Sequence, residues 1–187
     1  MQKLRKGWDV LCWRLCKQGL GVTFLWLKDH LLRLVTGMSP PATSRIRPNL
    51  YVGGQHYGRG LRRMAELGIT ASLNLRERAD DRAKGVALDK HLWLPTTDDT
   101  PPSPEQLDRA SEFIAEALAE GRGVYVHCMS GVGRAATTVV AYLISTGLTM
   151  DEAWSVIRQA RPFVRPSDAQ LAALEEFQAR YLAHNPA

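Results

Sequence analysis

Short apolar segments that alternate with helix-forming stretches constrain the fold of this chain more than any other feature. Each segment is mostly apolar and too short for a stable helix, which is typical of strands in a parallel sheet. These segments are residues 50–52, 69–75, 91–94 and 124–127. Since helices separate most of the strands, we predict an α/β fold with a mostly parallel central sheet of about four to five strands and helices on both faces.

Helix start and stop signals occupy the stretches between these segments. Ser103 and Gln106 have the spacing of a capping box, and Gly121 follows the apolar face of that helix. Residues 137–145 are apolar all round, which predicts a buried helix. Further helices are expected over residues 60–67 and from Thr149 and Ser167 onward.

The first 38 residues differ from the rest of the chain in charge. They hold seven Lys or Arg against two Asp, a formal charge of +5, whereas residues 39–187 hold 17 basic and 17 acidic residues. Proline pairs break helices, so the Ser-Pro-Pro-Ala-Thr stretch at residues 39–43 is a natural linker. We predict a basic amphipathic helical extension over residues 1–38 and one α/β domain over residues 39–187.

The extension has the composition of a helix that lies on a membrane surface. Its longest run without a formal charge, residues 18–27, is ten residues long, whereas a bilayer span needs about 20 apolar residues. Tryptophan beside Lys and Arg on an amphipathic helix favours the headgroup layer of an anionic membrane. The alternatives are a helical hairpin packed on the domain and a targeting peptide, which Asp9 and the lack of a small-residue cleavage site before Lys28 oppose. Nucleic acid is not expected as a partner, because the basic residues alternate with large apolar ones.

Three cysteines are too few for a disulfide framework. The helical spacing of Cys12 and Cys16 suits neither a bridge nor a paired metal site. We therefore expect a reducing, cytoplasmic environment. If the extension binds a membrane, the attachment is expected to be peripheral. Cys128 stands apart from the other two, and it is either a nucleophile or a small buried side chain.

Residues 128–134, Cys-Met-Ser-Gly-Val-Gly-Arg, join a predicted central strand to a predicted helix. Backbone N–H groups and the positive end of the helix dipole converge at such a turn, which favours a bound anion. Gly131 and Gly133 allow the backbone to turn its amides inward. Arg134 is a suitable cation because a guanidinium grips two phosphate oxygens at once. The same field favours the thiolate form of Cys128, so the loop is expected to hold a nucleophile within a phosphate site.

His127, Cys128, Gly131 and Arg134 form the pattern H-C-x-x-G-x-x-R. This pattern resembles the signature of the cysteine-based protein tyrosine phosphatase superfamily. The chain contains no G-x-x-x-x-G-K-[ST] and no G-x-G-x-x-G that opens a helix, so the phosphate loops of nucleotide triphosphatases and dinucleotide-binding folds are disfavoured.

A second segment resembles the general-acid loop of the dual-specificity branch of that superfamily. Residues 94–106 run from a strand end through Pro and Asp to a helix start. Asp98 matches the acid of the family by register, and Asp99 is close enough to be a rival; alternatively, the two aspartates cap a turn before Pro101. The resemblance extends from about residue 45 to residue 181 and implies a dual-specificity phosphatase-like domain.

The resemblance implies a two-step hydrolysis of phosphomonoesters. Cys128 attacks phosphorus while Asp98 protonates the leaving oxygen, and water then hydrolyses the phosphocysteine. His127 orients the loop without taking part in the chemistry, and no metal or cofactor is needed. The residues implied to bind the phosphate are Met129, Ser130, Gly131, Val132, Gly133 and Arg134.

Ala135 departs from the family pattern, in which Ser or Thr follows the arginine and donates a hydrogen bond to the sulfur. We expect slower breakdown of the phosphoenzyme as a result, unless Ser130 or Thr137 supplies a hydroxyl. Ala135 is also the only support for a phosphate-binding pseudophosphatase, an alternative that retention of the cysteine, arginine and acid opposes.

The substrate is expected to be a phosphorylated protein, carrying phosphotyrosine and, in a shallow pocket, phosphoserine or phosphothreonine. Residues 129–133 contain no Lys or Arg that would favour a polyphosphorylated headgroup. The alternative is a phospholipid phosphatase at a membrane surface, acting on phosphatidylglycerophosphate or a phosphoinositide, which the basic extension favours. Arg161 and Arg165 are candidates to bind a lipid headgroup or an acidic substrate, or are solvated charges.

Overall fold

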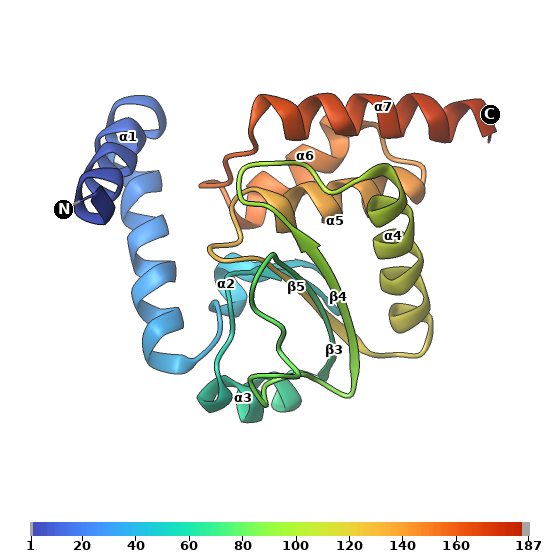
Figure 1. The fold of residues 1–187 in the computed structure, drawn as a ribbon, viewed down its shortest axis with the longest axis horizontal. Coiled ribbons are helices and arrows are strands. Elements are labelled where there is room, and N and C mark those ends of the chain that lie inside the picture. Colours follow the sequence, from blue (N-terminus) through green and yellow to red (C-terminus); the bar gives the residue numbers. More distant parts are fainter. Residues whose placement is uncertain (1, 185–187) are drawn as a thin grey trace.

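The computed structural model describes residues 2–184, and the side chains of residues 12–183. A central sheet is flanked by helices, with α1 along one side of the molecule (Figure 1). The helices are α1 (Gln2–Thr36), α2 (Pro41–Ser44), α3 (Leu61–Glu66), α4 (Pro104–Ala119), α5 (Arg134–Ser145), α6 (Met150–Ala160) and α7 (Asp168–His184), with a 3-10 turn at Gly58–Gly60. The strands are β1 (Arg45–Arg47), β2 (Leu50–Gly53), β3 (Ile69–Arg76), β4 (Lys90–Thr96) and β5 (Gly123–His127).

The strands lie in the order β1-β2-β5-β3-β4, and all neighbours are parallel except β1 and β2. The central strand, β5, is buried along its whole length, which explains why its sequence is apolar without alternation. These observations confirm the predicted α/β fold with a mostly parallel sheet. The antiparallel strand β1 was not predicted, because Ile46 is the only apolar residue among its three.

The two faces of the sheet are covered unequally. The main core lies between the sheet and the helices α4 to α7, and α5 is buried along most of its length. On the opposite face, Tyr51 and Tyr125 form a smaller cluster with Met64 of α3. Both faces are therefore closed, and the carboxyl ends of the parallel strands are left to form a site.

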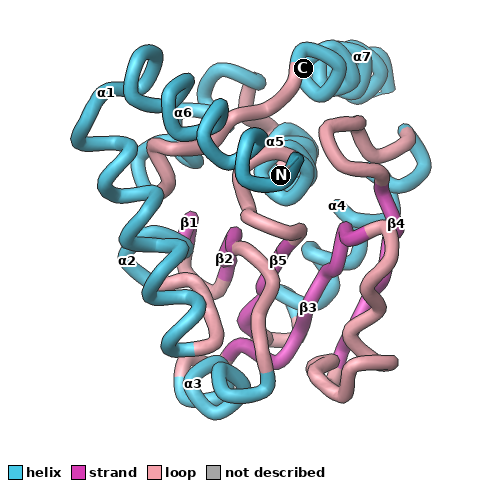
Figure 2. The backbone as a smooth tube through the Cα atoms, turned by 60° about the vertical axis from the view of Figure 1, so that its left-hand side comes forward, coloured by secondary structure: helices cyan, strands magenta, loops and turns pink. Residues whose placement is uncertain are grey.

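α1 consists of two helical segments. Gly19 has φ 82° and ψ 169°, a backbone conformation that favours glycine and bends the helix at this point. The second segment runs alongside α2 (Figure 2). There Arg33 Nη1 donates to the carbonyl oxygen of Gln55 at 3.0 Å. Among the residues described, no helix has the length and apolarity needed to cross a membrane.

Candidate active site

Cys128 follows the central strand β5, and α5 begins six residues later at Arg134. The side chain of Cys128 is buried, and its Sγ accepts a hydrogen bond from the backbone N–H of Gly131 at 3.3 Å. Gly131 has φ 67°, and a Cβ there would lie 2.3 Å from the carbonyl carbon of Gly53. Glycine is therefore required at this turn, which aims an amide at the sulfur as the sequence predicted.

Arg134 links the cysteine loop to the segment that follows β4. Its Nη1 donates to the carbonyl oxygens of Thr96 at 2.6 Å and Leu75 at 3.2 Å. Its Nη2 donates to Asp98 Oδ1 at 2.7 Å. The guanidinium is buried, whereas the side chain of Asp98 is largely exposed. Asp98 therefore lies in direct contact with the arginine of the loop, and one of its carboxylate oxygens is used by that contact.

Asp99 is held by its backbone. It has φ 62°, and its carbonyl oxygen accepts a hydrogen bond from Ser167 Oγ at 2.8 Å. No ion pair joins the Asp99 carboxylate to a cation among residues 12–183, although Asp99 lines the same cavity as Asp98. The contact with Arg134 thus distinguishes Asp98 from its neighbour.

These groups surround a cavity of about 810 Å³. Its walls include both aspartates, the start of α7 and the loop residues Cys128, Met129, Ser130, Val132, Gly133 and Arg134. The structure therefore brings the predicted site residues together, with Gly131 set behind the wall. A volume of this size is typical of pockets that enclose a small molecule and exceeds what a phosphoryl group alone requires.

Arg161 was considered in the sequence as a ligand for substrate or as a solvated charge, and both interpretations are wrong. The side chain is fully buried. Its Nε donates to the carbonyl oxygen of Gly131 at 2.7 Å, and its Nη2 donates to that of Ser130 at 3.1 Å. Its Nη1 pairs with Asp29 Oδ1 of α1 at 3.1 Å. Arg161 therefore satisfies two buried carbonyls of the cysteine loop and fixes this part of the loop in place.

Sequence reasoning missed Asp29, because a carboxylate in the extension has no recognisable spacing from the loop that it supports. The side chain of Asp29 is buried and also accepts hydrogen bonds from Thr43 Oγ1 at 2.6 Å and Ser39 Oγ at 3.3 Å. The predicted linker over residues 39–43 therefore supplies two hydroxyls to the same network, which ties α1 to the loop.

His127 is held by the carboxylate of Asp81, which was not predicted from the sequence. Its Nε2 donates to Asp81 Oδ2 at 2.7 Å, and Gln55 Nε2 donates to Asp81 Oδ1 at 2.9 Å. Burial raises the pKa of Asp81, but the hydrogen bond and the charge of His127, the hydrogen bond from Gln55 and the charge of His56 together outweigh burial, and the pKa falls to about 2. Asp81 is thus a carboxylate at neutral pH, which fits the predicted role of His127 in orienting the loop.

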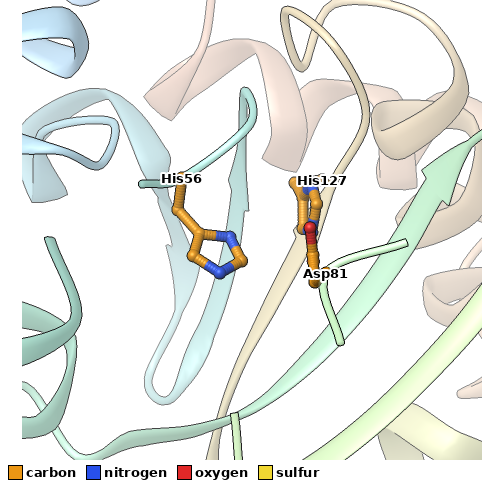
Figure 3. A group of neighbouring side chains, drawn as sticks. All are labelled: His56, Asp81 and His127. Carbon is orange, nitrogen blue, oxygen red and sulfur yellow. The ribbon is translucent and has the colours of Figure 1, made fainter. Parts of the chain in front are cut away.

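His56 completes this buried group (Figure 3). Its ring meets that of His127 edge to face at 4.9 Å between centroids. Burial lowers the pKa of His56 to about 4, and its Nε2 donates to the carbonyl oxygen of Val86 at 2.7 Å. His56, Asp81 and His127 offer ligand atoms within 4.8 Å of one another. The hydrogen bonds to Val86 and Asp81 use Nε2 of each ring, while Nδ1 of each ring is buried without a partner.

Ala135 is fully buried at the start of α5. The hydroxyl of Thr137 is buried without a partner, and Thr138 Oγ1 donates to the carbonyl oxygen of Arg134 at 2.9 Å. No hydroxyl among the side chains of residues 12–183 donates to Cys128 Sγ, so neither Ser130 nor Thr137 replaces the one that Ala135 lacks. The sulfur is supported by a backbone amide instead.

The fold and the site together define a class of protein. A cysteine follows the central parallel strand, a backbone amide of the next turn donates to its sulfur, and an arginine at the start of a helix contacts an aspartate. These are the parts of an α/β protein that binds a phosphate group around a thiol.

Comparison with known proteins identifies the family. Residues 50–180 match the family described as dual specificity phosphatase, catalytic domain, and the chain belongs to this family. It is 36% identical to dual specificity protein phosphatase 12 of Mus musculus over 124 residues, which are 63% of this chain and 35% of that protein. It is 30% identical to dual specificity protein phosphatase 22 of Xenopus tropicalis over 138 residues, 72% of this chain and 64% of that protein. The chain thus spans less than two thirds of the length of either relative.

Solved structures show the same fold. PTPMT1 in complex with PI(5)P aligns with a TM-score of 0.68 and 25% identity, over 74% of this chain and 96% of that one. Tk-PTP in the active form aligns with a TM-score of 0.67 and 30% identity, over 75% of this chain and 98% of that one. Because the family match begins at residue 50, α1 and its Asp29 lie outside the part that defines the family.

Replacing Asp29 tests whether α1 supports the loop. We expect Asp29→Asn to lower the free energy of unfolding by about 3–5 kcal/mol, because Arg161 would keep a buried charge without its partner. Glu66→Gln removes an exposed pair with Arg62 and Arg63 and is expected to cost no more than about 1 kcal/mol. Urea unfolding of the two variants measures the difference, and equal losses would contradict the role given to Asp29.

Proposed function

We propose that the protein is a cysteine-dependent phosphatase that hydrolyses phosphomonoesters through a phosphocysteine intermediate. The observation that carries this proposal is one cavity lined by Cys128, whose sulfur accepts a hydrogen bond from a backbone amide, and by the Arg134–Asp98 pair. A buried cysteine alone would be consistent with a small core side chain, and an arginine alone would be consistent with a simple anion-binding site. Their combination supports attack by sulfur on a bound phosphoryl group.

In the first step the Cys128 thiolate attacks phosphorus, the S–P bond forms and the bond to the leaving oxygen breaks. Asp98 donates a proton to that oxygen, while the loop amides and Arg134 hold the three remaining oxygens. The Arg134–Asp98 contact must loosen for Asp98 to carry this proton, because a substrate phosphate competes for the same guanidinium nitrogen. In the second step Asp98 removes a proton from water, which attacks phosphorus and releases the thiolate and inorganic phosphate.

Release of p-nitrophenol from its phosphate ester tests the proposal. With this ester we expect Cys128→Ser to abolish phosphate release. With an alkyl phosphate, whose leaving oxygen needs a proton, we expect Asp98→Asn to lower kcat by about 10²–10⁴. Asp99→Asn is the matched control and is expected to retain most of the activity. A larger loss in Asp99→Asn would reassign the acid, and an inactive unmodified protein that still binds phosphate would favour the pseudophosphatase.

Ala135 is expected to limit the second step. Ala135→Ser restores a donor next to the sulfur, and one such hydrogen bond corresponds to about a tenfold faster breakdown of the phosphoenzyme. A stopped-flow burst with p-nitrophenyl phosphate separates this step from the first one. If the steady-state rate after the burst is no higher in Ala135→Ser than in the unmodified protein, the missing hydroxyl does not limit the second step.

A phosphorylated protein is the first candidate substrate. The relatives carry the name dual specificity protein phosphatase, and the five residues between Cys128 and Arg134 bring no extra cation to the loop. Phosphotyrosine and, where the cavity permits, phosphoserine or phosphothreonine would then be the groups hydrolysed.

A phospholipid at a membrane surface is the second candidate, and the outer face of α1 favours it. Large apolar side chains recur there at helical spacing and are exposed: Leu20 (79%), Phe24 (65%), Leu27 (42%), Leu31 (53%) and Val35 (73%). Lys17 and Lys28 are also exposed on this helix. An apolar stripe with lysines nearby is typical of a helix that lies in the headgroup layer of an anionic membrane. We propose a cytoplasmic protein that attaches peripherally in this way.

Vesicle binding tests the membrane proposal. We expect the double variant Leu20→Asp, Phe24→Asp to lose most of its co-sedimentation with vesicles of phosphatidylglycerol and phosphatidylcholine, because the stripe could no longer enter the headgroup layer. Leu182→Asp changes an exposed leucine of α7 (57% exposed) and should sediment like the unmodified protein. Equal sedimentation of all three proteins would rule out the stripe as the attachment site.

A further inference from the structure

We propose that the active-site cavity contains a second anion subsite, formed by Arg14 of α1 and by Arg165, which lies between α6 and α7. This subsite is suited to a phosphodiester carried by the same substrate as the reacting phosphomonoester. This inference rests on the proposed phosphatase activity and concerns which substrates the cavity selects. Both arginines line the cavity that contains Cys128.

Arg14 is a buried cation without an anion. Its side chain is 2% exposed. Its Nη1 donates to Gln18 Oε1 at 2.6 Å and to the carbonyl oxygen of Phe163 at 3.0 Å, whereas its Nε is buried without an acceptor. Burial, and then the neighbouring charges of Arg165 and Arg161, lower its pKa to about 10, so it is still charged at neutral pH. A charge that is buried in this way without a counter-ion is costly, and an anionic ligand would offset the cost.

Arg165 is the second cation of the subsite. Its guanidinium lies 4.0 Å from the centroid of the Trp13 ring, and its backbone N–H donates to the carbonyl oxygen of Val132 in the cysteine loop at 2.7 Å. Ion pairs among the side chains of residues 12–183 include neither Arg14 nor Arg165, while Arg161 is paired with Asp29 and Arg134 with Asp98. Asp99 and Asp168 line the same cavity without pairing with either arginine. Two of the four arginines near the loop therefore have no carboxylate partner.

The bend in α1 brings both of its segments to the cavity that contains the cysteine. Trp13 and Arg14 precede Gly19, and Trp26 follows it, yet all three line the cavity. Arg14 lies over the Trp26 ring at 4.7 Å, which joins the two segments of the helix across the bend. The indole rings provide an apolar boundary, so the subsite combines two guanidinium groups with a surface that accepts a non-polar chain.

The apolar stripe of α1 favours a phospholipid as the source of the second anion. The helix that supplies Arg14 also exposes Leu20, Phe24 and Leu31, so the proposed membrane-binding stripe and one cation of the subsite belong to the same element. A lipid with a phosphomonoester in its headgroup also carries the phosphodiester that joins the headgroup to glycerol. Cysteine chemistry would act on the first group, while Arg14 and Arg165 bind the second.

A pair of soluble substrates tests the inference. Dihexanoyl phosphatidylinositol 5-phosphate carries both groups, whereas inositol 5-phosphate carries only the monoester, and neither requires a membrane. We expect the ratio of kcat/KM for the first to that for the second to fall about tenfold or more in Arg14→Gln and in Arg165→Gln. Lys17→Gln, an exposed cation on the same helix, should keep the ratio of the unmodified protein.

The ratio also separates the possible failures. An unchanged ratio in both arginine variants overturns the subsite. A second failure is that the arginine variants lose kcat/KM only for a phosphotyrosine peptide with acidic flanking residues, and not for the same peptide with flanking alanines. That result would mean that the arginines bind acidic proteins, and it would overturn the proposed phosphodiester ligand. If the unmodified protein releases no phosphate, the proposed activity fails, and calorimetric binding of the same two compounds to Cys128→Ser, with and without Arg165→Gln, still tests the subsite. Because Arg165 is exposed, that variant remains informative if Arg14→Gln does not fold.

Discussion

The buried Arg161–Asp29 pair is the interaction on which the site depends. Arg161 reaches two carbonyls of the cysteine loop, Ser130 and Gly131, and its charge is balanced by a carboxylate of α1 at 3.1 Å. A loop that turns its amides toward an anion must turn its carbonyls away, and those carbonyls need donors in a region closed to water. Without Asp29 the guanidinium that meets this need would be a buried, uncompensated charge.

This arrangement changes how α1 is understood. Residues 1–38 were predicted to be an extension of the domain, with a helical hairpin packed on the domain as one alternative. In the structure this helix supplies Asp29 to the support of the loop and Trp13, Arg14 and Trp26 to the cavity wall. On its outer face, in contrast, large apolar side chains are exposed. The segment of α1 that follows Gly19 thus carries Asp29 of the buried ion pair on one side and exposed leucines on the other, so the support of the cysteine loop and the proposed membrane-binding surface lie on the same segment.

Much of the site was predictable because the chemistry is local in sequence. Cys128, Gly131 and Arg134 lie within seven residues, and a strand followed by a helix places them at one turn. Asp98 was predicted as the acid from its register in a segment that resembles the general-acid loop of the family, with Asp99 as a rival. The structure brings Asp98 into contact with Arg134, and its role as the acid stays a prediction. Asp81 and His56 were missed because they reach His127 from separate loops, and Arg161 was misinterpreted because a sequence does not show whether a charge is buried.

The amino-acid sequence by itself determined the α/β class, the strand that leads into Cys128 and the residues of the phosphate loop, because apolar patterns and glycine positions act over a few residues. Only the tertiary structure decided which charges are paired. Arg161, Arg165 and Arg14 look alike as basic residues in the sequence, yet one is locked to Asp29, one lies against an indole ring and one is buried beside the cavity without an anion. The difference arises from burial and distance, which set the energy of a charge and depend on segments that meet only in the folded chain.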